Sequence, residues 1–417
     1  MQPEFFGEKK GRTKAPFSEN LTFEEIQGIM DRAIRMSERY RVMKLAGKSK
    51  EEIRAAFKKP VPMQVFKWSG MTDTIMSPID SIKYYKHFLR TGFISMDPKN
   101  GHVKAYVGGI DFKQFKFDHV TANNRQVGST IKPFLYTLAM REGFTPCHKV
   151  PNVPVSFPWG DSTWTPRNSG SAKWENQMVT LKFGLANSVN WITAWVLKQF
   201  NPEAVVDMAH KLGVKSYIDP VYSVILGTSG ISVEEMVNAY CVYANNGVHL
   251  DPIYVTRIED KNGNELARFI SKPTEAISEK TAYQMLSLMQ NVVDAGTAIR
   301  LRLTYNFEIP IAGKTGTTQN HSDGWFIGIT PNLVSGAWVG CEDRSAHFDE
   351  IRMGQGANMA LPIWALYMRK IIENDTTGLY SEADFNVPEE YDVFMDCDDS
   401  TDPLKDPNEE ILEFDLF

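Results

Sequence analysis

The chain has 417 residues, of which 42% are hydrophobic and 23% are charged, a composition typical of a globular protein with two or three domains. No run approaches about 18 uninterrupted apolar residues, which excludes a membrane-spanning helix. Residues 1–20 are polar and lack the apolar core of a signal peptide. We therefore expect either a cytosolic protein or one whose upstream anchor has been cut away.

The first quarter of the chain predicts helices followed by strands. Residues 22–58 space their apolar side chains at helical intervals and predict one long and one short helix, the second stopped by Pro60. Residues 61–68 predict a strand. A helix around residues 80–92 leads into a hairpin over residues 93–109, with its turn at D-P-K-N-G.

The rest of the body alternates groups of helices with pairs of strands. Helices are predicted over residues 176–214, 230–246 and 279–295, and a hairpin with an N-G turn over residues 252–266. Because helices are grouped between strand pairs, the pattern predicts an α+β fold with a mainly antiparallel sheet. The last predicted elements are strands over residues 309–318, 324–332 and 333–340 and a helix over residues 356–374.

The net charge of −6 is unevenly distributed. Residues 381–417 contain fourteen acidic residues and one lysine, which leaves 44 basic and 37 acidic residues in the body. This acidic tail also carries scattered apolar side chains that a fully solvated tail would not need. We expect the part from Phe385 to Phe394 to dock on the body and the rest to be looser.

The cysteines, at positions 147, 241, 341 and 397, include no C-x-x-C pair, and the sequence contains no H-E-x-x-H motif. Their spacing favours four unpaired thiols. We expect neither a metal site nor a cofactor, and no nucleic-acid partner.

A serine and a lysine stand three residues apart in the stretch RQVGSTIKPF, residues 125–134. If a helix begins at Ser129, Lys132 lies one turn along the same face, within reach of the serine hydroxyl. A serine becomes a good nucleophile only when a neighbour takes its proton. A lysine can do this only if burial or a nearby cation keeps it neutral. The helix N-terminus would offer free backbone N–H groups to an oxyanion.

Alone, Ser-x-x-Lys is a weak signal, because a capping serine followed by a solvated lysine gives the same pattern. Two further stretches strengthen it. LANSVN carries Ser188 and Asn190 ahead of an apolar run, and PIAGKTGTT carries residues 314–318 at the end of a predicted strand. The order Ser-x-x-Lys, Ser-x-Asn, Lys-Thr-Gly is that of penicillin-binding proteins and serine β-lactamases.

The stretches RQVGSTIKPF, LANSVN, GKTGTTQNHSDGWFIG and PIW closely resemble the transpeptidase domain of a bifunctional, class A penicillin-binding protein. The resemblance runs from about residue 60 to about residue 370. It implies the penicillin-binding/serine β-lactamase-like fold, with helices flanking the sheet and a helical subdomain. We expect an N-terminal helical linker over residues 1–59, the transpeptidase domain over residues 60–372 and the acidic tail over residues 373–417.

The resemblance also implies catalytic roles. Ser129 would attack the carbonyl of a D-Ala-D-Ala bond and form an acyl-enzyme with release of D-alanine, and Lys132 would activate it. Ser188 would relay a proton to the leaving nitrogen, and Asn190 would bind the substrate amide. Lys314 would keep the neighbouring lysine neutral and attract the terminal carboxylate.

Further positions are implied to bind substrate. Thr315 and Thr317 would offer hydroxyls to the carboxylate, and Gly316 would leave room for the substrate backbone along the strand. The oxyanion hole of the family maps onto the backbone N–H groups of Ser129 and Thr317. Other candidates for the cleft are Thr318, Trp164 and Asn168.

Three features accompany the resemblance. Val127 stands where the family usually has proline, which affects loop rigidity rather than chemistry. In SDGWF, Trp325 fits the core as well as the cleft wall, and Asp323 fits a turn. The membrane anchor and glycosyltransferase domain of a class A enzyme are expected upstream but missing here. We therefore expect an extracytoplasmic protein that binds peptidoglycan stem peptides and β-lactams.

Three rival functions remain open. A serine β-lactamase shares the motifs, but the Glu-x-x-Leu-Asn stretch of class A β-lactamases is absent between Asn190 and Lys314. A D,D-carboxypeptidase would use water as its acceptor. A penicillin-sensing domain would be acylated once and would signal. Turnover with a donor and an amine acceptor distinguishes the enzyme from the sensor.

Overall fold

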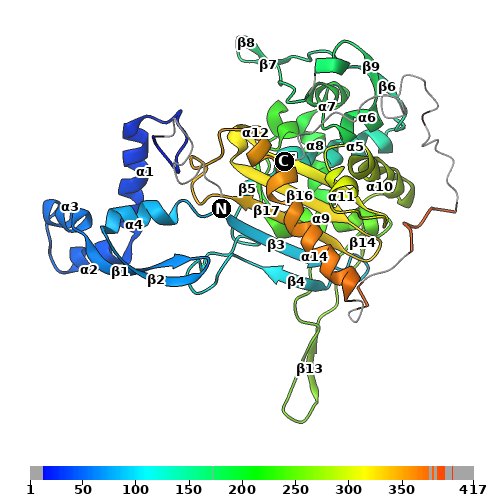
Figure 1. The fold of residues 1–417 in the computed structure, drawn as a ribbon. Helices are drawn as coiled ribbons and strands as arrows, with labels where there is room; N and C mark the ends of the chain where they lie inside the picture. Colours follow the sequence, from blue (N-terminus) through cyan, green and yellow to red (C-terminus); the bar gives the residue numbers. More distant parts are fainter. Residues whose placement is uncertain (1–12, 171, 375–377, 380–382, 390–396, 398–417) are drawn as a thin grey trace.

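The computed structural model describes residues 13–170, 172–374, 378–379, 383–389 and 397. Figure 1 shows an elongated N-terminal lobe beside a larger body, from which a thin hairpin projects. Within the described ranges, no helix is long and apolar enough to cross a bilayer.

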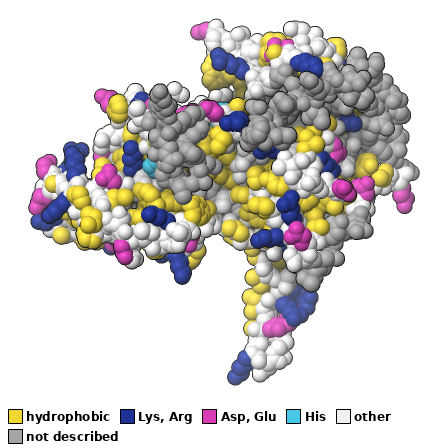
Figure 2. All heavy atoms as spheres, in the orientation of Figure 1, with side chains coloured by type: hydrophobic (Ala, Val, Ile, Leu, Met, Phe, Trp, Pro, Cys, Tyr) yellow, Lys and Arg dark blue, Asp and Glu magenta, His cyan; other side chains and the backbone are white. Residues whose placement is uncertain are grey.

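The N-terminal lobe confirms the predicted strand and the helical character of residues 22–58, but the predicted long helix is two helices, because Ser37 ends the first and caps the second. The helix predicted around residues 80–92 ends at Tyr85. Its first and third helices begin with capping boxes, in which a Ser or Thr and a Glu exchange hydrogen bonds. Phe66, Phe88 and Phe115 form a small core of their own beside the main one. Figure 2 shows hydrophobic side chains spread over the surface of this lobe. Its elements are α1 (Phe23–Met36), α2 (Glu38–Leu45), α3 (Lys50–Lys58), β1 (Val61–Lys67), β2 (Gly70–Met76) and α4 (Pro78–Tyr85).

The body is built on a five-stranded antiparallel sheet, which confirms the predicted α+β class. The strand order is β15-β16-β17-β3-β4, and each neighbouring pair is antiparallel. Every residue of β16 and β17 is buried, because helices cover both faces. The bounds are β3 (Arg90–Met96), β4 (Val103–Val107), β15 (Ala312–Thr317), β16 (Asp323–Ile329) and β17 (Val334–Gly340).

Two glycines let the helices approach the sheet closely. A Cβ on Gly328 would lie 2.5 Å from the ring of Trp364 in α14, and a Cβ on Gly336 would lie 2.3 Å from the side chain of Val237 in α9. Since Gly328 pairs with Ser335, the neighbour of Gly336, these glycines face opposite sides of the sheet. Helix α14 (Leu361–Glu373) therefore covers one face and α9 (Val233–Ala244) the other.

Most of the other helices gather on the α9 side and at the edge beside β15 (Figure 1), whereas α13 packs on the α14 face, where a Cβ on Gly324 would lie 2.6 Å from the side chain of Met359. The single helical region predicted over residues 176–214 is three helices, because Ser188 adopts a left-handed backbone (φ 56°) and Asn201 caps a new helix. The remaining α-helices of the body are α5 (Lys132–Arg141), α6 (Leu181–Ala186), α7 (Asn190–Leu197), α8 (Pro202–Lys211), α10 (Glu279–Asp294), α11 (Arg300–Leu303), α12 (Ile351–Gly354) and α13 (Gly356–Met359).

Short strand pairs complete the body. The predicted hairpin is present as β12 and β13, with Gly263 at a positive φ in its turn, and it forms the projection in Figure 1. The short strands are β5 (Arg125–Gln126), β6 (Lys149–Pro151), β7 (Phe157–Trp159), β8 (Ser162–Trp164), β9 (Met178–Thr180), β10 (Gly230–Ile231), β11 (Val248–His249), β12 (Arg257–Glu259), β13 (Glu265–Arg268) and β14 (Thr274–Glu275).

The prediction of four unpaired thiols is wrong for two of them. Cys147 and Cys397 form a disulfide across 250 residues of chain, whereas Cys241 and Cys341 are free and buried. Nothing in the spacing indicates a pair so far apart. The feature that could have indicated a disulfide is the expected extracytoplasmic location, because disulfides form and persist in oxidising compartments.

The acidic tail is attached to the body at two described points. Phe385 is only 6% exposed and joins the main core, which confirms docking for that residue. Burial, and to a lesser degree the charge of Asp384, raises the pKa of Tyr283, so this segment lies near α10. Cys397 is the second point. Residues 390–396, with Phe394, lie outside the described residues, as do residues 398–417.

Candidate active site

Ser129 lies in a single turn of 3-10 helix, Gly128–Ile131, directly before α5. The prediction of an α-helix beginning at Ser129 is therefore wrong by three residues. Gly128 has a positive φ, and a Cβ there would lie 2.7 Å from the backbone oxygen of Thr317. The glycine thus lets the serine turn pack directly against the end of β15. Ser129 itself is half-buried.

Lys132 is fully buried in the first turn of α5. Its amine donates to the backbone oxygen of Ser188 (2.6 Å), to Asn190 Oδ1 (2.6 Å) and to Ser188 Oγ (3.2 Å). Burial lowers the pKa of Lys132 well below its ordinary value, and the charge of Lys314 lowers it further. Burial is the larger cause, whereas the sequence-based expectation gave that role to Lys314.

Lys314, on the edge strand β15, is also fully buried. Its amine donates to Ser188 Oγ (3.1 Å) and to the backbone oxygen of Thr315 (3.1 Å). Burial lowers the pKa of Lys314 to about 7. Ser188 Oγ therefore accepts from both lysine amines, which leaves its own proton free to be donated elsewhere.

Ser188 and Asn190 reach the lysines from the sharp corner between α6 and α7. The left-handed backbone of Ser188 makes this corner, and Asn190 opens α7. Asn168, predicted to line the cleft, accepts hydrogen bonds from the backbone N–H groups of Asn190 (2.9 Å) and Trp191 (3.1 Å). It therefore caps α7 and holds Asn190 in place.

The other cleft candidate, Trp164, lies on the hairpin formed by β7 and β8. Its ring stacks on Phe157, with centroids 5.9 Å apart. Asn190 Nδ2 donates to the backbone oxygen of Arg167 (2.6 Å), so the segment that follows Trp164 is tied to α7. The structure gives Trp164 a packing partner and records no contact with the two lysines.

The threonines of β15 have different neighbours. The hydroxyls of Thr315 and Thr297 share a 2.6 Å hydrogen bond, and Thr317 Oγ1 accepts from the backbone N–H of Gly356 (3.0 Å). Thr318 is buried and its hydroxyl donates to Asp323 Oδ2 (3.0 Å), so its side chain supports the strand end. Sequence reasoning gave no role to Thr297, although it lies in the stretch DAGTA, residues 294–298, which resembles the family as well.

Gly316 is required by packing. A Cβ there would lie 2.7 Å from the backbone oxygen of Val127 and 2.9 Å from the methyl group of Thr130. Trp325, for which core and cleft wall were equally open, is fully buried and donates from its indole to the backbone oxygen of Gln126 (2.8 Å). It is a core residue that holds the strand leading to the serine.

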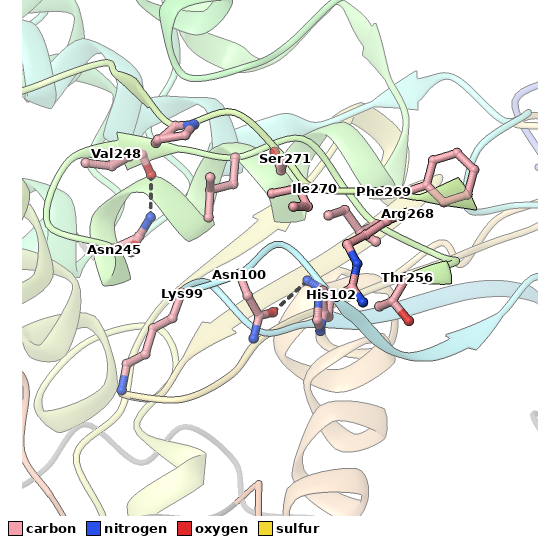
Figure 3. A pocket seen from close by; sticks show the side chains of 13 residues that line it. Lys99, Asn100, His102, Asn245, Val248, Thr256, Arg268, Phe269, Ile270 and Ser271 are labelled. Atoms are coloured by element: carbon pink, nitrogen blue, oxygen red, sulfur yellow. Dashed lines mark hydrogen bonds between the residues drawn. The ribbon is translucent and has the colours of Figure 1, made fainter. Parts of the chain in front are cut away.

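A separate cavity of about 550 Å³ lies between the turn that joins β3 to β4 and the base of the β12–β13 hairpin (Figure 3). Lys99, His102, Asn245 and Ser271 are among its lining residues. It shares no residue with the lysine cluster, so the chemistry of the three motifs belongs elsewhere on the molecule.

The fold is that of penicillin-binding protein transpeptidase domains. Penicillin-Binding Protein 1A from Haemophilus influenzae aligns with a TM-score of 0.64 at 25% identity, over 72% of this chain and 49% of that chain. The PonA1 protein from Mycobacterium tuberculosis, solved in complex with penicillin V, aligns with a TM-score of 0.58 at 21% identity, over 88% of this chain and 96% of that one.

Sequence comparison identifies the family. Residues 91–336 match the penicillin binding protein transpeptidase domain, and residues 12–89 match the penicillin-binding protein middle domain. Penicillin-binding protein 1A from Aquifex aeolicus is 32% identical over 72% of this chain, and that from Neisseria lactamica is 33% identical over 67%. The chain spans 40% and 36% of the length of these relatives. It therefore belongs to the penicillin-binding protein transpeptidase family.

Proposed function

We propose that this chain is a serine D,D-transpeptidase that cross-links peptidoglycan stem peptides and is acylated by β-lactams. The observation that carries the proposal is the meeting of two fully buried lysines at one hydroxyl, Ser188 Oγ, beside the Ser129 turn. Among the described residues, neither Lys132 nor Lys314 forms an ion pair with a carboxylate. Burying two lysine amines without a carboxylate partner lowers the stability of the folded protein. A catalytic role therefore explains the arrangement better than a structural one.

In the first step, Ser129 Oγ attacks the carbonyl carbon of the D-Ala-D-Ala bond while neutral Lys132 takes the hydroxyl proton. A neutral amine has two donors and one lone pair. Lys132 can therefore keep its two 2.6 Å hydrogen bonds, to the Ser188 backbone and to Asn190, and turn its lone pair to the serine. The oxyanion is received by the backbone N–H groups of Ser129 and Thr317.

In the second step, the tetrahedral intermediate collapses and the C–N bond breaks. The proton on Lys132 passes through the Ser188 hydroxyl, 3.2 Å away, to the leaving nitrogen, and D-alanine departs. An acceptor amine then attacks the acyl-enzyme, the protons travel in reverse, and Ser129 is restored. A β-lactam follows the first step, but its leaving nitrogen stays tethered to the acyl group.

Substrate recognition follows from charge. Lys314, when protonated, attracts the terminal carboxylate, and Thr315 and Thr317, two residues apart on β15 and therefore on one face, offer it their hydroxyls. Asn190 binds the substrate amide. We assign Gly316, Thr318 and Asn168 to holding these groups in position, in line with their contacts, and Trp164 to the rim of the cleft.

The location and division of the chain are part of the proposal. We place the protein on the outer face of the cytoplasmic membrane, as part of a longer anchored protein with a glycosyltransferase domain. The Cys147–Cys397 disulfide supports an oxidising compartment. The division into residues 1–59, 60–372 and 373–417 stays a prediction.

Intact-mass measurement after incubation with benzylpenicillin tests the nucleophile. The wild type should gain the mass of one penicillin, and a peptide map should place it on Ser129. Ser129→Ala should gain none, whereas Ser162→Ala, on an exposed strand, should react like the wild type. A label on another residue would disprove the assignment.

Turnover separates the transpeptidase from its rivals. With a D-Ala-D-Ala donor and an amine acceptor, the transpeptidase should form the amide product in proportion to the acceptor. A carboxypeptidase would release D-alanine at the same rate without the acceptor. A sensor would be acylated once and would form no product. Hydrolysis of benzylpenicillin at a steady rate would indicate a β-lactamase.

A further inference from the structure

Asp323, the first residue of β16, is a fully buried carboxylate between the serine turn and the end of β15. Its Oδ1 accepts from Arg125 Nε (2.6 Å) and from the indole of Trp338 (3.1 Å). Its Oδ2 accepts from Thr318 Oγ1 (3.0 Å), and Arg344 Nε lies 3.1 Å away, within ion-pair distance but not aligned for a hydrogen bond. Both oxygens of this carboxylate are therefore engaged.

Two of the partners of Asp323 come from the two segments that carry the proposed chemistry. Arg125 lies in β5, four residues before Ser129, and Thr318 directly follows β15. Arg344 adds a second link, because its guanidinium also donates to the side chain of Gln126, the neighbour of Arg125 (2.7 Å). One carboxylate thus joins the strand that leads to the nucleophile and the strand that ends with Thr317.

The serine turn and the end of β15, which Asp323 holds together, are packed too tightly to move relative to each other. A Cβ on Gly128 would lie 2.7 Å from the backbone oxygen of Thr317, and a Cβ on Gly316 would lie 2.7 Å from that of Val127. The serine turn and β15 are therefore in direct backbone contact. The N–H groups of Ser129 and Thr317 belong to these two segments, so their separation depends on this joint.

We propose that Asp323 is a positioning residue that sets the oxyanion hole by clamping the strand before Ser129 to the end of β15. The inference rests on the proposed function. Asp323 touches no reacting atom and acts through Arg125 and Thr318. Preorganised donors stabilise a transition state only when they lie at the right place before the reaction, and displacements of about 1 Å can cost about a hundredfold in rate.

Asp323→Asn is the sharpest variant because it preserves shape. An amide has no charge and only one acceptor oxygen, so it loses the ion pairs with Arg125 and Arg344, and its NH₂ group must face either Arg125 and Trp338 or Thr318 and Arg344. Stopped-flow acylation with a chromogenic β-lactam separates the dissociation constant of the first complex from the acylation rate constant. We expect the rate constant to fall about tenfold to a hundredfold, with the dissociation constant within about twofold of the wild type.

The matched control is Asp97→Asn, which removes another largely buried carboxylate from an ion pair. Its partner is Lys104 in β4, the strand at the sheet edge opposite β15. This variant should lower the melting temperature and leave the acylation rate constant unchanged. Equal acylation rate constants in Asp323→Asn and the wild type would overturn the proposal, as would an equal loss in the control.

Arg344→Ala keeps the test decisive if Asp323→Asn does not fold. Arg344 is 40% exposed in its side chain, so its loss leaves a smaller buried defect. It removes the contacts with Asp323 and Gln126 together, and we expect a severalfold fall in the acylation rate constant. An unchanged constant would contradict the clamp. A wild type that benzylpenicillin does not label would instead overturn the proposed function.

Discussion

Lys132 and Lys314 carry the same amine but have different surroundings. Lys132 has three oxygen acceptors around its amine, so its charged form is satisfied, and the neutral form needs only two of them. Lys314 contacts Ser188 Oγ and the backbone of its own strand, at the edge where a carboxylate would be bound. These surroundings suit Lys132 as a general base and Lys314 as a positively charged group that binds the carboxylate.

Arginine substitutions separate the two roles. Lys132→Arg should abolish acylation by benzylpenicillin, because a guanidinium stays protonated and cannot accept the serine proton. Lys314→Arg should keep part of the activity, because it keeps the charge. The second-order acylation constants of both variants, measured with circular dichroism to verify folding, test the division. An equal loss in both would contradict it.

The two lysines also predict a pH profile. Burial and the charge of Lys314 both lower the pKa of Lys132, whereas burial alone lowers that of Lys314, so we expect Lys132 to lose its proton first as the pH rises. Acylation by an anionic β-lactam should therefore rise through the acid range as Lys132 becomes neutral. It should fall above about 7, the pKa of Lys314, as the second charge is lost.

Lys314→Arg serves as the control for the alkaline side of this profile. An arginine stays charged, so the decline above neutral pH should disappear in the variant while the acid side remains. Acylation constants measured from about pH 5 to about pH 10 would show this. An alkaline decline that is the same in both proteins would mean that another group causes it.

At the scale of elements, the N-terminus of α7 is held by a residue from another segment. Asn168 lies 22 residues before Asn190 in the sequence and supplies the cap that Val189, the residue before the helix, cannot give. Asn168→Ala should cost about 1 kcal/mol of stability and slow acylation, because Asn190 loses its support. Asn168→Asp keeps the acceptor and should keep the melting temperature. Thermal unfolding and acylation rates of the two variants test this, and equal melting temperatures would contradict the cap.

The same elements show what the sequence could and could not predict. Alternating and periodic patterns located the strands of the main sheet and most of the longer helices, but not β2 or most of the short strand pairs. The three ordered motifs predicted the cluster of Lys132, Ser188, Asn190 and Lys314. The patterns did not show that a 3-10 turn precedes α5, because periodicity does not distinguish the first turn of a helix. They also did not show what Asp323 does, since its partners lie 5 to 198 residues away along the chain.

At the scale of the whole molecule, the proposed site is assembled from separate layers. The edge of the sheet supplies Lys314, the helical side supplies Ser188 and Asn190, and the turn between β5 and α5 supplies Ser129. The tail adds a further connection between the layers. It follows α14, which lies on one face of the sheet, and it buries Phe385 in the main core. Its described part ends at Cys397, which forms the disulfide with Cys147, just beyond α5.

The last prediction concerns this tail. Deleting residues 381–417 should leave penicillin acylation within about twofold, because all three motifs lie upstream, and should lower the melting temperature. The disulfide closes a very long loop, for which chain entropy predicts about 5 to 6 kcal/mol, and Phe385 adds about 2 kcal/mol by burial. The double variant Cys147→Ser/Cys397→Ser keeps the acidic residues and should reproduce most of the loss. Added salt should weaken only the remaining electrostatic part, because surface charges are screened beyond about 10 Å at about 0.1 M. A truncated protein that folds normally but is no longer acylated would show that the tail takes part in the chemistry.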